Sequence, residues 1–176
     1  GNGSLMRLAP VVLYAWPSAS LARRLAGESS RTTHGARECV AACRLFAAVL
    51  TNALAGRPKA ELLPEPDAEV APTPRLAGIA RGDFIGKPVD AIRGGGHVLD
   101  CLEAALWCFY TTESFADAVL AAANLGDDAD TTAAVCGQVA GAWYGEAAIP
   151  AGWLEVLHMR REIGELGERL VGMRGV

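Results

Sequence analysis

The chain has 176 residues, 51% of them hydrophobic and 20% charged, so it can bury a core and is not a disordered segment. Its net charge of −4 argues against nucleic acid as a partner, because neutralising phosphates needs a clustered basic face. No apolar run is long enough to cross a bilayer without a charge, Pro or Gly, and no signal-peptide pattern is present, so no membrane contact is expected.

Apolar residues recur with helical periodicity along the chain, and no segment has the alternation of a strand, which predicts an all-α fold. Residues 62–96 interrupt this pattern with a cluster of prolines and three consecutive glycines. We expect an irregular surface excursion there, within a single domain of residues 1–176. In chain order, the predicted helices span residues 4–14, 17–28, 35–54, 97–110, 114–123, 128–144 and 151–171.

All five cysteines lie within these helical patterns. Cys39 and Cys43 are four residues apart and share a helix face, so a metal-binding pair is conceivable there. Because no His or further Cys stands at ligand spacing, the cysteines are better explained as small buried hydrophobic residues. Unpaired thiols are typical of a reducing compartment, and we therefore expect a cytoplasmic protein.

The most informative segment is Asn-Leu-Gly-Asp-Asp-Ala-Asp-Thr-Thr at residues 124–132, which opens a long predicted helix. Three carboxylates and two hydroxyls gather there, and hard cations such as Mg²⁺, Mn²⁺ and Ca²⁺ prefer such oxygen ligands. Helix capping is the alternative, since one Asp serves as an N-cap and the others suit the helix dipole. The pattern alone leaves metal binding and capping equally open.

Three other segments each have two explanations. The Gly-Asn-Gly-Ser sequence at residues 1–4 precedes an apolar helix, where free amide N–H groups hold a phosphate or oxyanion, or where the serine is an ordinary N-cap. His34, just ahead of a long helix, either contacts a phosphate or ribose hydroxyl or caps that helix. The three glycines before His97 form either a mobile loop over a ligand or a simple linker.

Taken together, four blocks of sequence resemble the ADP-ribosylglycohydrolase family, which includes the dinitrogenase reductase-activating glycohydrolases. They occur in the family's order and span nearly the whole chain. The last block, which begins Asn-Leu-Gly-Asp-Asp-Ala-Asp-Thr-Thr, is the most specific, whereas the proline-rich excursion matches only loosely. The four blocks are residues 1–10, 33–36, 96–107 and 124–145.

The resemblance implies an all-α orthogonal bundle with two Mg²⁺ or Mn²⁺ ions. Such enzymes hydrolyse the N- or O-glycosidic bond between ADP-ribose and an acceptor. In the family's Asp-x-Asp-Thr motif both carboxylates and the Thr hydroxyl bind metal, and those positions correspond to Asp128, Asp130 and Thr131. Asp127 and Ala129 stand where the family often has Gly and Thr.

The resemblance also implies where the substrate lies. Asn2, Gly3 and Ser4 correspond to a segment beside the ribose and diphosphate, and His34 to a residue near the diphosphate or a ribose hydroxyl. His97 stands where relatives often carry an aromatic residue near the substrate. Glycosidic cleavage passes through an oxocarbenium-like state, and a carboxylate is expected to act as acid or base.

The family's Thr-Asp-Asp-Thr motif, an early Gly-Asp segment and the Glu regarded as the acid/base are all absent from this sequence. We therefore expect the C-terminal portion of a longer domain, or a short remnant, with half of a two-metal site and little activity alone. Its expected partners are ADP-ribose or an ADP-ribosylated substrate and the missing N-terminal portion, which leaves an apolar face exposed. A catalytically dead ADP-ribose-binding or structural relative is the alternative. The acceptor, whether Arg, Ser, a nucleobase or a small molecule, stays open.

Overall fold

The computed structural model describes residues 1–173, which form helices, short 3₁₀ turns and loops without any strand. The predicted all-α class is confirmed. The α-helices are α1 (Gly3–Met6), α2 (Ala9–Ala15), α3 (Ala19–Arg31), α4 (Arg37–Leu54), α5 (Pro74–Arg81), α6 (Val98–Tyr110), α7 (Phe115–Ala123), α8 (Ala129–Tyr144), α9 (Ala151–Val156) and α10 (Arg160–Gly172). The 3₁₀ turns are η1 (Lys59–Glu61), η2 (Val89–Ala91) and η3 (Glu146–Ala148).

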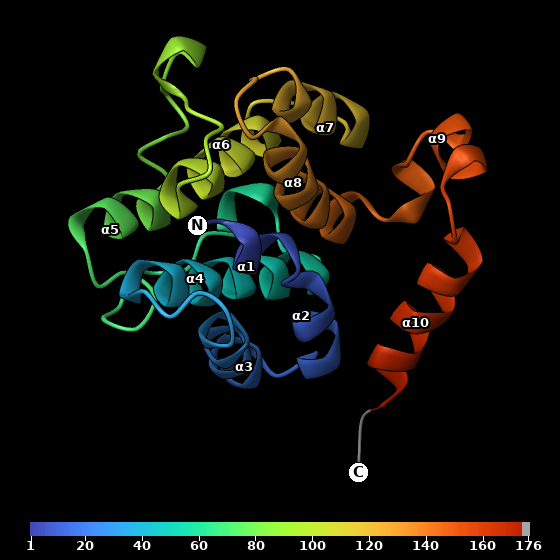
Figure 1. Cartoon of the computed structure of the whole chain (residues 1–176), viewed down its shortest axis with the longest axis horizontal. Helices are drawn as coiled ribbons and strands as arrows, with labels where there is room; N and C mark the ends of the chain where they lie inside the picture. Colours follow the sequence, from blue (N-terminus) through green and yellow to red (C-terminus); the bar gives the residue numbers. More distant parts are fainter. Residues whose placement is uncertain (174–176) are drawn as a thin grey trace.

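Helix α4 runs through the middle of the bundle and is buried along most of its length. Its sequence is apolar or small on nearly every face, which is the pattern of a helix surrounded by others. Helices α3, α6 and α8 pack against it, and α8 crosses it obliquely (Figure 1). Phe46 of α4, together with Phe109 and Leu102 of α6, is among the largest fully buried side chains. Helices α4, α6 and α7 pack against α8 and fix its position.

The predicted helix over residues 4–14 is wrong, because the structure has two helices with a break at Arg7 and Leu8. Pro10 explains the break. It has no N–H to bond the Met6 carbonyl, and its ring obstructs a helix that continues through it. Pro10 lies instead in the first turn of α2, where no intrahelical donor is needed.

Two further boundaries differ from the sequence-based expectation. The predicted helix at residues 151–171 is divided into α9 and α10 by a turn at Met159, whose φ of +57° lies in the left-handed region. Residues 62–96, expected to be irregular, contain helix α5. Thr73 caps this helix through its hydroxyl and Pro74 takes the first helical position, a favourable way to begin a helix.

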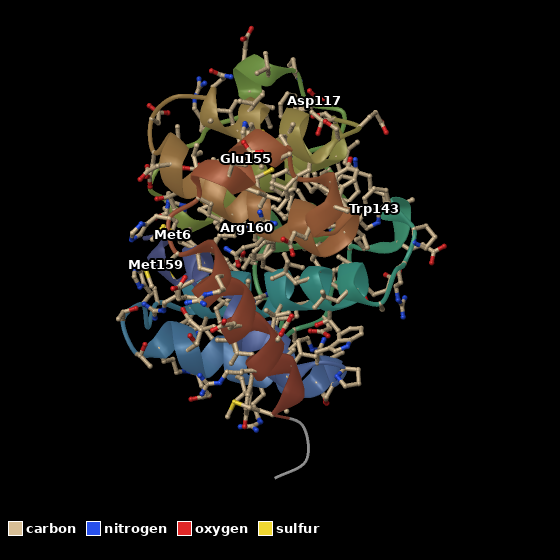
Figure 2. The ribbon with its side chains drawn as sticks, turned by 90° about the vertical axis from the view of Figure 1, so that its right-hand side faces the viewer. Met6, Asp117, Trp143, Glu155, Met159 and Arg160 are labelled. Atoms are coloured by element: carbon tan, nitrogen blue, oxygen red, sulfur yellow. The ribbon has the colours of Figure 1, made fainter. Side chains whose placement is uncertain are left out.

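Helices α9 and α10 form an arm beside the bundle, and α10 packs mainly against α2 (Figure 1). Figure 2 views the molecule from the side that α10 covers, with Met159 and Arg160 at the start of that helix. The arm has no fully buried residue, and the side chain of Val156 is 83% exposed. The other large hydrophobic residues exposed on the arm are Leu157, Met159, Ile163, Leu166 and Met173.

All five cysteines are buried and free, which confirms that they act as small hydrophobic residues without disulfides. Cys39 and Cys43 share one face of α4 as expected, and each contacts the N-terminal segment of the chain. Within residues 1–173, no helix combines the length and the apolar composition that crossing a membrane requires.

Candidate functional site

The chain enters α8 through a tight turn that is held by the glycine-rich loop. Gly126 and Asp127 both have positive φ, of +79° and +54°, and this reverses the chain between α7 and α8. The Asp128 N–H and the Thr132 hydroxyl then donate to the Gly94 carbonyl, each at 3.1 Å. The loop is therefore fixed against the start of α8 rather than being a free linker.

Asp128 occupies the N-cap position of α8, but its side chain makes no capping hydrogen bond. Its Oδ2 accepts instead from the Asn2 side-chain amide at 2.7 Å, a contact between residues 126 positions apart in the sequence. This hydrogen bond, with smaller contributions from Thr131 and Asp130, holds the pKa of the Asp128 carboxyl below its usual range. The capping explanation is therefore wrong for Asp128, whose carboxylate faces the N-terminal segment.

The other two predicted metal ligands lie beside Asp128 but differ in exposure. Thr131 is buried, with 8% of its surface exposed, whereas the Asp130 side chain is exposed to solvent. Both lie in the first turn of α8, within three residues of Asp128, and both contribute to the lowered pKa of its carboxyl. Asp127 is exposed and its positive φ is a conformation that glycine adopts more easily, which is consistent with Gly being common at this position in the resembled family.

The first residues of the chain are packed against His34. A Cβ placed on Gly1 or Gly3 would lie 3.0–3.1 Å from the imidazole ring of His34, so the ring rests directly on this bare backbone. Asn2 is only 8% exposed and stands at the N-cap position of α1 without a capping bond. Ser4 lies inside α1, so the interpretation of Ser4 as an N-cap is wrong.

The Ser4 hydroxyl belongs to a buried polar cluster beneath this segment. It accepts hydrogen bonds from the Ser30 hydroxyl at 3.2 Å and from the Cys43 thiol at 3.4 Å. The Ser30 hydroxyl also lies 2.9 Å from the His34 carbonyl, and the Ser30 carbonyl accepts from the His34 N–H at 2.6 Å. Ser30, which the sequence did not single out, thus ties Ser4 to His34.

His34 does not cap the following helix, because the N-cap of α4 is Ala36. Its Nδ1 lies 2.7 Å from the Thr33 hydroxyl, which orients the ring. Of the two explanations that the sequence left open for His34, capping is wrong. Contact with a phosphate or ribose hydroxyl stays a prediction.

His97 has a structural role that the sequence did not indicate. It is the N-cap of α6, where Nδ1 accepts from the Leu99 N–H at 3.3 Å. Its Nε2 lies 3.8 Å from Oε2 of Glu38, at the start of α4. The neighbouring Gly96 backbone approaches the Asp128 carboxylate, so His97 stands at the edge of the same cluster. Contact between His97 and a substrate stays a prediction.

The site brings together most of the residues singled out from the sequence. Asn2 bonds Asp128, which is followed by Asp130 and Thr131 in the first turn of α8, and His34 packs against the glycines on either side of Asn2. In the part of the chain that the structure describes, no three His, Cys, Asp or Glu side chains gather closely enough to hold a metal ion. The oxygen donors present are therefore two carboxylates, a hydroxyl and the amide oxygen of Asn2.

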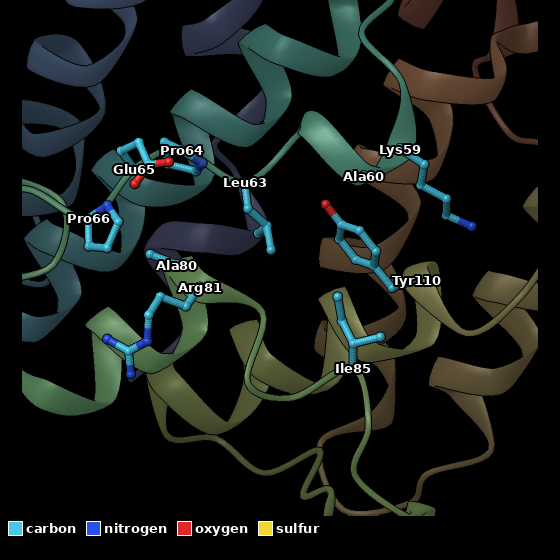
Figure 3. Close-up of a pocket in the computed structure, with 10 residues that line it drawn as sticks. All are labelled: Lys59, Ala60, Leu63, Pro64, Glu65, Pro66, Ala80, Arg81, Ile85 and Tyr110. Atoms are coloured by element: carbon cyan, nitrogen blue, oxygen red, sulfur yellow. The ribbon is translucent and has the colours of Figure 1, made fainter.

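A cavity of about 700 Å³ lies elsewhere, between η1, α5 and the end of α6 (Figure 3). It shares no lining residue with the Asp128 cluster. Two of its polar groups are inaccessible or already paired: the Tyr110 hydroxyl is buried without a partner, and the Lys59 amine donates to the Thr112 carbonyl and lies 4.5 Å from the centre of the Phe109 ring. Burial raises the pKa of Tyr110. This cavity does not replace the Asp128 cluster as the candidate site.

The structure is an all-α bundle with carboxylates at the start of α8, and comparison with known proteins names the family. Residues 1–176 match the ADP-ribosylglycohydrolase family, and the chain belongs to it. The solved structure of an "ADP-ribosylglycohydrolase-related protein complex" is similar, with a TM-score of 0.89 and 44% sequence identity, over 99% of this chain and 61% of that chain. The fold inferred from the resemblance is thus confirmed.

Curated relatives share the sequence over nearly all of this chain. The ADP-ribosylarginine hydrolases Tri1 of Pseudomonas putida and Serratia proteamaculans are 42% and 39% identical over 97% and 98% of it. The ADP-ribosyl-[dinitrogen reductase] glycohydrolase of Rhodospirillum rubrum is 29% identical over 100% of it. These alignments cover 45%, 47% and 58% of the relatives, so the chain spans about half the length of the curated proteins it matches.

Proposed function

We propose that this chain contributes the α8 side of the active site of a metal-dependent hydrolase that cleaves the bond between ADP-ribose and an acceptor. One observation carries the proposal: Asp128 stands at the N-cap position of α8 yet directs its carboxylate to Asn2 rather than to its own helix. A carboxylate needed only for capping would bond the first amides of the helix. Membership of the glycohydrolase family supports the same conclusion.

The donor set fits a hard divalent cation. Asp128, Asp130 and Thr131 offer two carboxylates and a hydroxyl at one helix end, which are ligands that Mg²⁺ and Mn²⁺ accept. The hydrogen bond from Asn2 lowers the pKa of Asp128 and so favours the ionised carboxylate, which is the form that binds metal. A bound ion supplies positive charge that holds ribose hydroxyls and stabilises developing negative charge on oxygen.

The protein groups around this cluster orient the substrate. The His34 ring packs on the backbone of Gly1 and Gly3, so in this proposal diphosphate oxygens meet the imidazole together with the backbone N–H groups that the ring leaves free. Asn2 fixes Asp128 and closes one wall. His97, held as the N-cap of α6, lies at the edge of the cluster, where its half-exposed ring can stack on a flat part of the substrate.

The remaining ligands and the acid/base carboxylate come, in this proposal, from residues outside the 176. Two observations support this: no three acidic, His or Cys side chains gather as a metal site within residues 1–173, and curated relatives are about twice as long as the segment they share. The chain alone should therefore bind ADP-ribose with Mn²⁺ but release none from a modified protein. Its free, buried thiols support a reducing compartment such as the cytoplasm.

ADP-ribosylarginine is the linkage to test first. Two relatives that share 42% and 39% identity with this chain are named ADP-ribosylarginine hydrolases, whereas the dinitrogen reductase glycohydrolase shares 29%. With the missing portion supplied as a separate polypeptide, hydrolysis of an ADP-ribosylated arginine peptide is the expected result. Equal cleavage of serine-linked ADP-ribose would overturn the preference for arginine.

Titration calorimetry with Mn²⁺ and ADP-ribose tests the site itself. We expect Mn²⁺-dependent binding to the wild-type chain, weakened by more than about tenfold in Asp128→Asn and Asp130→Asn, since loss of a ligand costs at least as much as loss of an outer-sphere partner. Asp90→Asn is the matched control, because Asp90 lies on η2 and bonds none of the cluster residues. Unchanged affinity in both site variants would contradict the proposal, as would robust hydrolysis by the chain alone.

A further inference from the structure

Gln138 makes three hydrogen bonds to the N-terminal segment, although more than a hundred residues separate them in the sequence. Its Nε2 donates to the carbonyls of Leu5 and Met6 at 3.0 and 3.1 Å. Its Oε1 accepts from the Ala9 N–H at 2.8 Å. A single side-chain amide thus bonds both sides of the break between α1 and α2.

Two of these backbone groups, the Met6 carbonyl and the Ala9 N–H, are ones that the helix break leaves without a backbone partner, whereas the Leu5 carbonyl also accepts from the Leu8 N–H at 3.1 Å. Carbonyls in the last turn of a helix and N–H groups in the first turn have no complete set of intrahelical bonds. Leu5 and Met6 end α1, and Ala9 begins α2, where Leu8 at the N-cap position offers no side-chain bond. Gln138 therefore caps α1 and α2 at once, from a third helix.

The position of Gln138 on α8 connects this cap to the candidate site. Thr131 and Gln138 are seven residues apart, which is about two turns, so they lie on the same face of α8. The N-terminal segment runs along that face in the same direction as α8. Asn2 meets Asp128 at one end and Leu5 and Met6 meet Gln138 at the other.

Because α1 is a single turn, it cannot be stable without tertiary contacts. Two contacts with α8 hold the segment in register, namely the Asn2–Asp128 bond and the Gln138 bonds. We infer that Gln138 is a positioning residue that holds residues 2–4 over the oxygen cluster of α8, so that their backbone is ordered to receive the diphosphate of ADP-ribose. The substrate part of this inference rests on the proposed function.

Two substitutions of Gln138 distinguish its hydrogen bonds to the Leu5 and Met6 carbonyls from the one that it accepts from the Ala9 N–H. Gln138→Met keeps the length of the side chain and removes all three hydrogen bonds. Gln138→Glu keeps the acceptor for Ala9 but sets a carboxylate against the carbonyls of Leu5 and Met6. The matched control is Asn52→Leu, because the Asn52 amide likewise donates to a distant backbone carbonyl, that of Leu62 at 2.9 Å, at the other end of α4.

Amide hydrogen exchange measures the order of the segment. In Gln138→Met we expect the amides of residues 5–12, Pro10 excepted, to exchange about tenfold faster, as local opening becomes easier, while those in the middle of α4 keep their protection. In Gln138→Glu we expect faster exchange at the amides of residues 5 and 6 and unchanged protection of the Ala9 amide. This variant provides the test if Gln138→Met does not fold. Asn52→Leu should leave residues 5–12 unchanged. Wild-type protection of residues 5–12 in the Gln138 variants would overturn the inference.

Ligand binding then distinguishes positioning from a purely structural role. In Gln138→Met the affinity for ADP-ribose with Mn²⁺ should fall about tenfold, while affinity for Mn²⁺ alone, held by residues of α8, changes little. Asn52→Leu should preserve both affinities. Faster exchange with unchanged ADP-ribose affinity would overturn the positioning role. If the wild-type chain does not bind ADP-ribose, the proposed function fails, and with it the role of residues 2–4 in receiving the diphosphate. The claim that Gln138 orders the N-terminal segment is then tested by hydrogen exchange alone.

Discussion

The junction between the N-terminal segment and α8 differs sharply from the arm formed by α9 and α10. At the junction, polar side chains are paired across long sequence separations, as in the bonds of Asn2 with Asp128 and of Gln138 with Leu5. On the arm, apolar side chains are exposed, and α10 has no fully buried residue. A substitution at the junction should therefore affect both stability and the site, whereas one on the arm should affect neither strongly.

The largest difference in the free energy of unfolding is expected when a leucine is replaced by alanine at the junction and on the arm. Leu5 of α1 is fully buried, and Leu5→Ala should lower the free energy of unfolding by about 2–5 kcal/mol, because it removes apolar contacts and leaves a cavity. Leu166 of α10 is 53% exposed, and Leu166→Ala should cost less than about 0.5 kcal/mol. Urea denaturation followed by circular dichroism measures both. Similar costs for the two variants would contradict the contrast.

A smaller effect is expected from two asparagines. Asn2→Ala removes the hydrogen bond to Asp128 at a largely buried position, and should cost about 1–3 kcal/mol. Asn124→Ala removes a bond that the exposed side chain makes to a carbonyl of its own helix, and should cost less than about 0.5 kcal/mol. The difference in denaturation midpoint between the variants checks this. An Asn2→Ala protein as stable as wild type would show that the junction is not held by this bond.

The positions of the longest helices and the gathering of Asp128, Asp130 and Thr131 at one helix start could be predicted from the sequence, because both depend on local patterns. The runs that became α4, α6 and α8 are long, periodic and free of internal proline. Asp128, Asp130 and Thr131 are close in sequence, so any helix start brings them together. Pro10 was a local signal for the break after α1, because proline lacks the N–H that a continuous helix needs. The apolar periodicity of residues 4–14 concealed this signal.

The contacts that complete the site could not be predicted in the same way. Nothing in the sequence around Gln138 indicates that its amide bonds Leu5, since the pairing depends on how α8 packs along α1. The capping role of His97 and the buried hydroxyl of Ser30 are likewise fixed by tertiary packing. A glutamine or serine within a helical pattern has the same local signature whether it faces solvent or a distant backbone group.

The turn into α8 offers a prediction with a modest effect. Asp127 has a φ of +54°, where glycine has no steric penalty and alanine is disfavoured by about 1 kcal/mol or more. Asp127→Gly should therefore be more stable than Asp127→Ala by about 1 kcal/mol, with wild type between them because Asp tolerates this conformation better than Ala. Thermal denaturation of the three proteins measures the order. A reversed order of the two variants would contradict a left-handed residue at this turn.

The smallest effect on stability is expected where the arm is most apolar. Ile163 and Leu166 are each about half exposed on α10, so a double substitution of both by Glu removes few buried contacts and should change the free energy of unfolding by less than about 0.5 kcal/mol. It should, however, reduce self-association in sedimentation velocity, because a contiguous exposed apolar surface favours it. Val89→Glu is the control, an equally exposed apolar residue outside the arm. If Val89→Glu reduces association as much, added charge rather than the apolar face of the arm is responsible. If the double variant loses substantial stability, α10 is more firmly part of the bundle than its exposure indicates.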